Sequence, residues 1–311
     1  MSEGEMIGPY SIKLQHLPAN NILIGSDKGS LPYSSERPRH EVRLSNRWIM
    51  QSQVSAKLWQ KVMQETTPTN TATGTDTSHA TSNISSDFAE GYSWDEIEGF
   101  LIIINEASKK MGIEGEWRLP TESEWQSAQN QLSIYVPEKK EEVLSDQPHP
   151  NYRGAPTDGR PRIIENPHSM MRLYRVSRMA HPSKKMVSIK SQASIKNGQS
   201  GQIFRLIFVP SNWQPSEVVV PDFFNLKRLA IQEILIALII GVLPSFAIPI
   251  VRGMGSYALT GWVNLLFGGL CLAFASSLFW RPRTPTWKFA EDGNSMQETR
   301  LKGKKLLKVG H

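Results

Sequence analysis

Two long apolar runs near the C-terminal end of the 311-residue sequence restrict what this chain can fold into. They span Leu229–Val251 and Leu259–Trp280, and charged residues stand just outside both. A helix rises about 1.5 Å per residue, so each run is long enough to cross a hydrocarbon core about 30 Å thick. The alternative is a pair of buried soluble helices, but neither run has a polar face. We therefore expect two transmembrane helices, 229–251 and 259–280, joined by the short loop 252–258.

The distribution of charge predicts how these helices are oriented. The tail 281–311 carries eight Lys and Arg residues against three Asp and Glu, a net charge of +5 out of +6 for the whole chain. Such an excess beside a membrane span indicates the cytoplasmic side. With two spans, the N-terminal part and the basic tail 281–311 then both face the cytoplasm. The stretch "KGKKLLK" (302–308) either contacts anionic lipid headgroups or stays solvated. Because the basic character is confined to the tail, we expect no nucleic-acid partner.

Other residues near the N-terminus and within the runs refine this interpretation. The first twenty residues lack an apolar stretch, so we expect no signal peptide. The single cysteine, Cys271, lies inside the second run, which excludes an internal disulfide. Glu233 either sits at the membrane interface or makes a buried polar contact. Proline should kink the first helix at Pro244 and Pro249, and the Gly268–Gly269 pair should let a neighbouring helix approach closely.

The part before the membrane helices is expected to be a soluble α+β domain, 1–215, followed by a linker, 216–228. It contains a Thr- and Ser-rich segment, about 66–87, that is too poor in apolar residues to fold alone. Alternating patterns and turn residues predict strands within Ile22–Ser26, His40–Met50 and Gly201–Pro210. Helical patterns are found in Ser55–Gln64, Ser93–Met111 and Thr121–Gln131.

Two of these helices begin with a capping box. In each, a Ser or Thr is followed three residues later by Glu: Ser93 with Glu96, and Thr121 with Glu124. Glu122 and Glu124 also lie where the positive end of the helix dipole favours anions. We interpret these carboxylates as structural groups rather than as general acids or bases, because no partner that would shift their pKa can be named from the sequence.

The order of several segments carries a resemblance. "ILIGS" (22–26), "ERPRHEVRLSNRWIMQSQVS" (36–55), "YSWDEIEGF" (92–100), "EWRLPTESEW" (116–125), "RVSRMAHPS" (175–183) and "IFRLIFV" (203–209) follow one another along the chain. Together they resemble successive signatures of the formylglycine-generating enzyme family, also called the sulfatase-modifying factor domain, over roughly 20–210. The most specific signature comprises Arg118, Leu119, Pro120, Thr121, Glu122, Glu124 and Trp125. The resemblance implies a compact, C-type-lectin-like domain with little regular secondary structure.

One chemical feature of that family is missing here. Formylglycine generation in the family relies on a pair of cysteines that hold copper, and the expected soluble domain has none. The segment between the capped helix and the last strands is also shorter than the resemblance implies. We therefore do not expect formylglycine generation. The seven histidines lack metalloprotease spacing, and no phosphate-binding glycine motif is present, so the sequence names no cofactor and no metal site.

The remaining candidates are surface residues and tryptophans. A basic stretch is expected to form a surface that binds anionic groups, or alternatively to support the core through ion pairs; it comprises Arg172, Arg175, Arg178, His181, Lys184 and Lys185. Trp94, Trp117 and Trp125 are expected to anchor the core rather than to stack on a ligand.

Three functional hypotheses follow. The first is a membrane-anchored, non-catalytic binding or scaffold protein. The second is an enzyme of altered chemistry, in which at least two of Glu122, Glu124, His149 and His181 line one pocket. The third is an accessory subunit of a larger membrane complex, in which Glu233, Pro244 and Gly268–Gly269 face protein.

Overall fold

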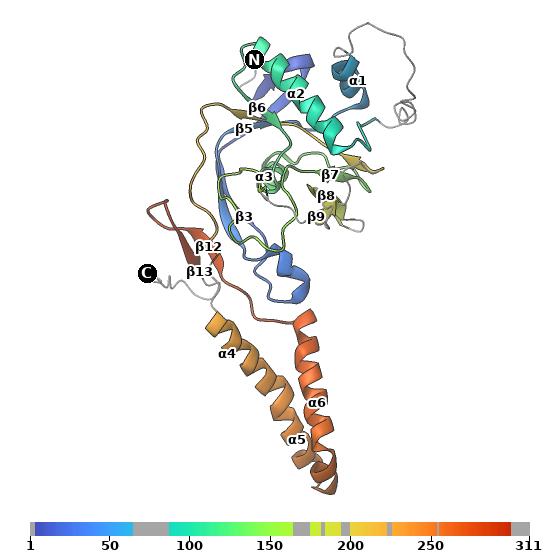
Figure 1. Cartoon of the computed structure of the whole chain (residues 1–311), viewed down its shortest axis with the longest axis vertical. Coiled ribbons are helices and arrows are strands. Elements are labelled where there is room, and N and C mark those ends of the chain that lie inside the picture. Colours follow the sequence, from blue (N-terminus) through green and yellow to red (C-terminus); the bar gives the residue numbers. More distant parts are fainter. Residues whose placement is uncertain are drawn as a thin grey trace. The chain divides into compact units, whose positions relative to one another are not determined.

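The chain divides into two compact units in the computed structural model, drawn in Figure 1. The first comprises Met1–Ile22, Val42–Pro148 and Pro156–Glu217, and the second Leu23–Glu41, His149–Ala155 and Val218–His311. The structure describes residues 4–64, 87–163, 175–181, 184–193, 200–222, 226–253 and 255–299. Apart from Asp87, the expected Thr- and Ser-rich loop 66–87 lies outside the described residues, and so does Arg172.

A five-stranded sheet lies at the centre of the first unit. Its order is β1-β2-β5-β11-β6, and every recorded pairing in it is antiparallel. The strands are β1 (Glu5–Ile7), β2 (Lys13–Leu17), β5 (Arg47–Ile49), β11 (Ile207–Pro210) and β6 (Gly115–Arg118). Strand residues that face the interior, such as Leu14 and Ile49, are buried, so the sheet buries an apolar surface as alternating patterns predict.

A second sheet of the same unit has the order β10-β7-β8-β9. Its strands are β10 (Gln202–Ile203), β7 (Glu141–Val143), β8 (Arg175–His181) and β9 (Lys184–Ala193). The predicted strands are thus present, but two of them are divided. His40–Met50 holds β4 (His40–Leu44) and β5, while Gly201–Pro210 holds β10 and β11.

Three α-helices complete the first unit: α1 (Ala56–Gln64), α2 (Trp94–Lys110) and α3 (Glu122–Leu132). Each lies within a residue or two of its predicted range. Both predicted capping boxes are confirmed, because the Ser93 hydroxyl accepts from the Glu96 backbone N–H, and the Thr121 hydroxyl accepts from that of Glu124. The caps fix where α2 and α3 begin.

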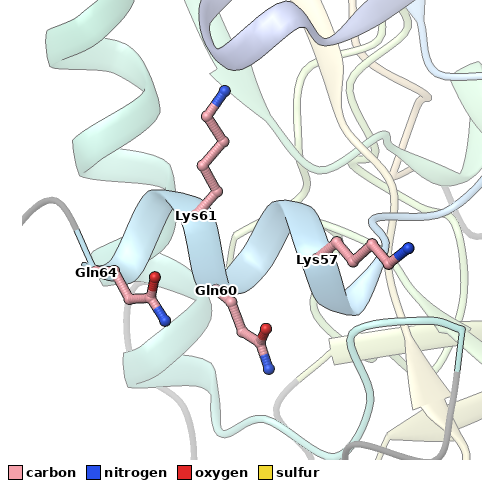
Figure 2. A pocket seen from close by; sticks show the side chains of 4 residues that line it. All are labelled: Lys57, Gln60, Lys61 and Gln64. Carbon is pink, nitrogen blue, oxygen red and sulfur yellow. The ribbon is translucent and has the colours of Figure 1, made fainter.

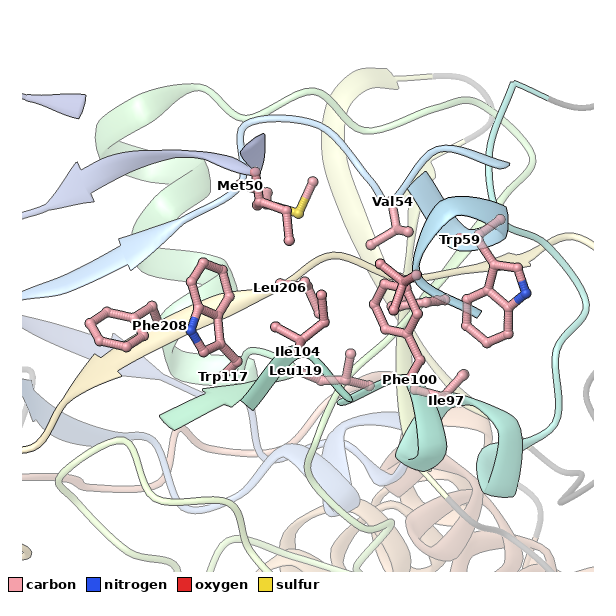
Figure 3. Close-up of a cluster of buried hydrophobic side chains, with 14 of the residues drawn as sticks. Met50, Val54, Trp59, Ile97, Phe100, Ile104, Trp117, Leu119, Leu206 and Phe208 are labelled. Atoms are coloured by element: carbon pink, nitrogen blue, oxygen red, sulfur yellow. The ribbon is translucent and has the colours of Figure 1, made fainter. Parts of the chain in front are cut away.

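The main core lies between the helices and the central sheet, and Figure 3 shows its side chains converging. Trp59 stacks on Phe100 with ring centroids 4.8 Å apart. Trp117 is buried, and its indole N–H donates to the Ser108 hydroxyl at 2.8 Å, so its polar atom is satisfied. Trp125 anchors a second buried cluster, and Trp94 packs against the main one. The prediction that these tryptophans belong to the core is confirmed.

The second unit contains the helices of the apolar runs. The first run forms α4 (Leu226–Ile236), a π-helical turn η3 (Ala237–Val242) and α5 (Leu243–Arg252). The π turn lies directly before Pro244, whose missing N–H leaves the helical hydrogen-bond ladder incomplete. The second run lies within α6 (Gly255–Phe279). The first helix therefore begins inside the expected linker 216–228, and α6 begins inside the expected loop 252–258.

Length and composition support one membrane span. Among the described residues, the helical stretch Lys227–Arg252 is apolar and long enough to cross a bilayer, whereas the apolar part of α6, Thr260–Ser276, is shorter. The second predicted span therefore stays a prediction.

Glycines set the distance between these helices. The α5 and α6 helices run side by side (Figure 1), and α6 also packs against η3. A Cβ built on Gly269 would lie 2.4 Å from the Gly241 carbonyl oxygen, closer than any side chain tolerates. The close approach predicted for the Gly268–Gly269 pair is thus made by Gly269. Toward the opposite end of these helices, the Arg281 guanidinium lies 3.0 Å from the Glu233 carboxylate. The Glu233 side chain is 55% exposed, so this polar contact is not a buried one, and the interface position of Glu233 stays a prediction.

Replacing Gly269 by valine is expected to separate the helix pair. The added side chain would clash with the backbone at Gly241, and such overpacking costs about 2 kcal/mol. We expect protease cleavage within 226–279 of the detergent-solubilised chain to become more than tenfold faster. Gly268→Val is the matched control, since a Cβ there meets nothing within 4 Å. Equal cleavage rates for the two variants would contradict the packing.

Part of the basic tail 281–311 is folded. The stretch 302–308, expected either to contact lipid headgroups or to stay solvated, lies outside the described residues. Within 281–311, strands β12 (Thr286–Phe289) and β13 (Met296–Thr299) pair as an antiparallel hairpin. They belong to a sheet of order β13-β12-β4-β3, where β3 spans Asn20–Ile24, and Trp287 pairs with His40 in parallel. The Asp292 carboxylate accepts from the Asn294 backbone N–H and closes the turn. The prediction for the tail used only its net charge and did not consider the turn residues around Asp292.

Candidate functional site

The sequence signature 118–125 builds a buried ion cluster where β6 leads into α3. The Glu124 carboxylate is 0% exposed and accepts two bonds from the Arg118 guanidinium, both at 2.7 Å. The Arg47 Nε donates to the same carboxylate at 3.1 Å, and the Thr121 backbone N–H donates at 2.8 Å. One side chain thus completes the helix cap and pairs with two arginines, which explains why Glu occupies this position.

The electrostatics of this cluster keep Glu124 ionised. Burial by itself would raise the pKa of Glu124, but the charge and hydrogen bonds of Arg118, followed by those of Arg47, outweigh it and hold the pKa below its ordinary value. The pKa of Arg118 is raised in turn, because the attraction of Glu124 outweighs the cost of burial. A carboxylate that is fully paired and charged at neutral pH cannot serve there as a proton donor.

Glu122, the neighbouring acid, is paired with one residue of the predicted anion-binding surface. Its carboxylate forms an ion pair with Arg178 on β8, and both side chains are largely buried. This arrangement corresponds to the alternative that Arg178 supports the core. Arg175, His181, Lys184 and Lys185 lie in β8 and β9 of the same sheet. The anion-binding surface therefore stays a prediction, with Arg178 already engaged by Glu122.

A third carboxylate lies against the first turn of α3. Asp146 is buried; it accepts from the Glu122 backbone N–H at 2.6 Å and from the Arg162 backbone N–H at 2.7 Å. Burial raises the pKa of Asp146 to about 6, and the nearby charges of Glu122 and Glu124 act in the same direction, against the two backbone hydrogen bonds. No local sequence pattern points to Asp146, because its burial depends on the packing of distant segments.

The raised pKa of Asp146 predicts a dependence of stability on pH. The folded state binds this proton more tightly than the unfolded state, so the contribution of Asp146 to stability falls as the pH rises from 3.8 to about 6. Between pH 4 and pH 7 the loss should amount to about 2 kcal/mol. In Asp146→Asn this component should vanish, and comparing urea unfolding of the two proteins at both pH values measures it. Parallel pH profiles would contradict the assignment.

A second ion cluster holds the two sheets of the first unit together. The Arg205 guanidinium forms a fully buried ion pair with the Glu142 carboxylate of β7. It also donates to the backbone carbonyls of Met50, at 3.1 Å, and Tyr135, at 2.7 Å. The sequence analysis did not single out either residue, because Arg205 lies inside a strand-like apolar segment. The cluster is a structural brace, since its donors and acceptors are committed to one another.

The cavity that stands out in the described part of the chain lies elsewhere. It is a shallow depression of about 390 Å³ on the outer face of α1, lined by Lys57, Gln60, Lys61 and Gln64 (Figure 2). None of the carboxylates of the α3 region lines it. Among the described residues, no group of three or more His, Cys, Asp or Glu side chains is placed to hold a metal ion. None of the four residues proposed to line a catalytic pocket, Glu122, Glu124, His149 and His181, lines this depression.

Sequence comparison now identifies the region that contains the α3 cluster. Residues 15–146 match the family model of the sulfatase-modifying factor enzyme 1-like domain. The match contains the whole signature from Arg118 to Trp125 and ends at Asp146. It covers less than half of the chain, so the resemblance proposed for the later segments up to about 210 stays a prediction.

Comparisons with individual proteins add little to this sulfatase-modifying-factor-like region. The structure of PvdO from Pseudomonas aeruginosa is 15% identical, with a TM-score of 0.47, covering 64% of this chain and 94% of that one. The Treponema denticola variable protein 1 is 16% identical, with a TM-score of 0.39, covering 67% and 99%. Neither similarity is high enough to inform function. A search of curated protein sequences gave no match.

Proposed function

We propose that this chain is a membrane-anchored, non-catalytic binding or scaffold protein built on a sulfatase-modifying-factor-like domain. The observation that carries the proposal is the state of Glu124. Glu124 belongs to the family signature, and its carboxylate is buried and forms ion pairs with Arg47 and Arg118. The interactions of this carboxylate connect β5, β6 and α3, which is a structural role.

The other acids and the cysteine content support the same proposal. Glu122 is engaged by Arg178, and Asp146 by two backbone N–H groups. The family generates formylglycine with a pair of cysteines. This chain lacks such a pair, because Cys271 is its only cysteine and lies on α6. A single cysteine cannot supply the pair that this reaction uses in the family.

The membrane anchor is proposed to be a hairpin of two spans. The candidate span Lys227–Arg252 supplies the first. For the second we propose α6, which packs against the first run at glycine-to-glycine distance, as membrane helices do. The basic residues after α6 favour a cytoplasmic location for both the tail and the domain 1–215.

Two measurements on the full-length protein test this proposal. The chain should stay in the membrane pellet after alkaline carbonate extraction, and its release would overturn the anchor. The detergent-purified chain, supplied with Cu(I) and a cysteine-containing sulfatase-type peptide, should leave the cysteine unchanged by mass spectrometry. Conversion to formylglycine would overturn the non-catalytic assignment.

The scaffold role has its own test. Gentle solubilisation from the native membrane should yield the chain together with a stoichiometric partner, identified by mass spectrometry. Stoichiometric integral-membrane partners would favour an accessory subunit of a larger complex instead, and a chain that emerges alone would contradict the scaffold role.

A further inference from the structure

A closed loop of the second unit lies beside the end of α6. The Ser26 backbone N–H donates to the Glu36 carbonyl at 2.7 Å, which ties the loop ends together. Arg37 Nη1 donates across the loop to the Gly29 carbonyl at 3.2 Å. The middle of the loop is a 3₁₀ turn, η2 (Leu31–Glu36), that packs against α6. Short-range ties of this kind give the loop 26–37 a fixed shape.

One glycine sets the height of this loop along α6. A Cβ on Gly29 would lie 2.1 Å from the Pro282 carbonyl oxygen and 2.7 Å from the Cβ of Arg281. No side chain fits there, so the loop backbone is held against the two residues that follow the last apolar residues of α6. In addition, the Thr284 backbone N–H donates to the Asp27 carbonyl at 2.7 Å. The loop is thus fixed where a membrane-embedded α6 would leave the hydrocarbon.

The exposed side chains at this level have the character of a membrane interface. Leu31 at the tip of the loop is 44% exposed, and Phe279 and Trp280 at the end of α6 are exposed as well. Lys28 Nζ lies 4.4 Å from the centroid of the Tyr33 ring and bonds to its hydroxyl at 3.0 Å. Aromatic rings with a polar tip, and lysines with an apolar stem, are enriched where hydrocarbon meets headgroups.

We propose that the loop 26–37 is a further contact with the bilayer, seated in the headgroup region beside α6. Leu31 reaches the outer acyl layer, while Lys28 and Tyr33 lie at the level of the lipid phosphates. The inference rests on the proposed membrane anchoring and adds a lipid-binding element from the N-terminal part of the chain. Its partner is a phospholipid surface rather than a protein, because η2 packs against α6, whose exposed end carries Phe279, and Leu31 on η2 is exposed as well.

Local charge indicates which lipids this contact prefers. Lys227 at the start of the first span is exposed, and the Arg283 side chain is mostly exposed beyond α6 although it also pairs with Asp27. Lys28 and Arg283 present cations at the loop itself, and Lys227 presents one at the start of the first span. A basic rim of this kind favours anionic headgroups by about 1 kcal/mol per residue near the surface.

Spin labelling of the full-length chain tests the proposal. In a Cys271→Ser background, nitroxide labels are placed by Leu31→Cys, Phe274→Cys and Ile102→Cys, one in each of three variants. Phe274 is exposed on α6, and Ile102 is exposed on α2 in the first unit. The proteins are reconstituted in equal parts of phosphatidylcholine and phosphatidylglycerol, and collision rates with oxygen and with a water-soluble nickel chelate are measured.

We expect the label at position 31 to be severalfold less accessible to nickel than the label at 102. Its ratio of oxygen to nickel collision rates should lie between the ratios of the labels at 102 and 274. A label at 31 as accessible to nickel as that at 102, with 274 protected, would overturn the loop contact and leave the anchoring intact. If the label at 274 is also accessible to nickel, the anchoring itself fails, and the loop contact with it.

Discussion

Replacing Glu124 by glutamine is expected to lower the free energy of unfolding of the first unit by about 4 kcal/mol. Arg47 and Arg118 would remain buried without the charge of their partner. The NH2 group of the glutamine would also place a hydrogen-bond donor against the N–H donors of the two guanidinium groups. Amides of α3 that exchange through global unfolding should then exchange with deuterium about a thousandfold faster, as followed by mass spectrometry of the full-length chain.

The same substitution at Glu106 is the matched control. Glu106 lies exposed on α2, so Glu106→Gln should change stability by less than about 0.5 kcal/mol. If Glu124→Gln behaved like Glu106→Gln, the carboxylate would have to be solvated rather than paired. The structural role assigned to the family signature would then be wrong.

Truncating Ile104 to alanine should cost about 3 kcal/mol. The side chain is 0% exposed and packs in the main core, where its loss leaves a cavity beside Trp117 and Phe100. Urea unfolding, followed by tryptophan fluorescence in detergent, measures the change, because that core contains Trp59 and Trp117.

Ile102 on the same helix provides the control for this cavity. Ile102 is 55% exposed. Ile102→Ala therefore removes the same side-chain volume and changes helix propensity by the same amount as Ile104→Ala, but it opens no cavity. We expect its unfolding midpoint to stay within the error of the wild type. Comparable losses for the two variants would mean that α2 does not present the face toward the core that the structure gives it.

Local signals account for what could be predicted. The capping boxes at Ser93 and Thr121 fix helix starts through bonds that span only three residues, so the sequence contains both partners side by side. Tryptophans at strand and helix positions were assigned to the core because large rings gain most from burial. The first apolar run likewise declares a helix by length and composition alone.

The features that could not be predicted from the sequence depend on contacts between distant segments. Glu124 was assigned to its helix cap, but its partner Arg47 lies 77 residues away, and no periodic pattern links the two. The buried pair of Arg205 and Glu142 spans 63 residues in the same way. The tail was interpreted through its net charge, and strand β12 was missed because its partner β4 lies near the other end of the sequence.

The return of the chain after α6 has a consequence for biogenesis. The Arg283 guanidinium meets Asp27 across 256 residues, and the Phe289 backbone N–H meets the Glu41 carboxylate across 248. During synthesis, the segment that holds Asp27 and Glu41 leaves the ribosome long before these partners exist. Its sheet can be completed only after both apolar runs have been translated, so synthesis of the two apolar helices precedes the last step of folding.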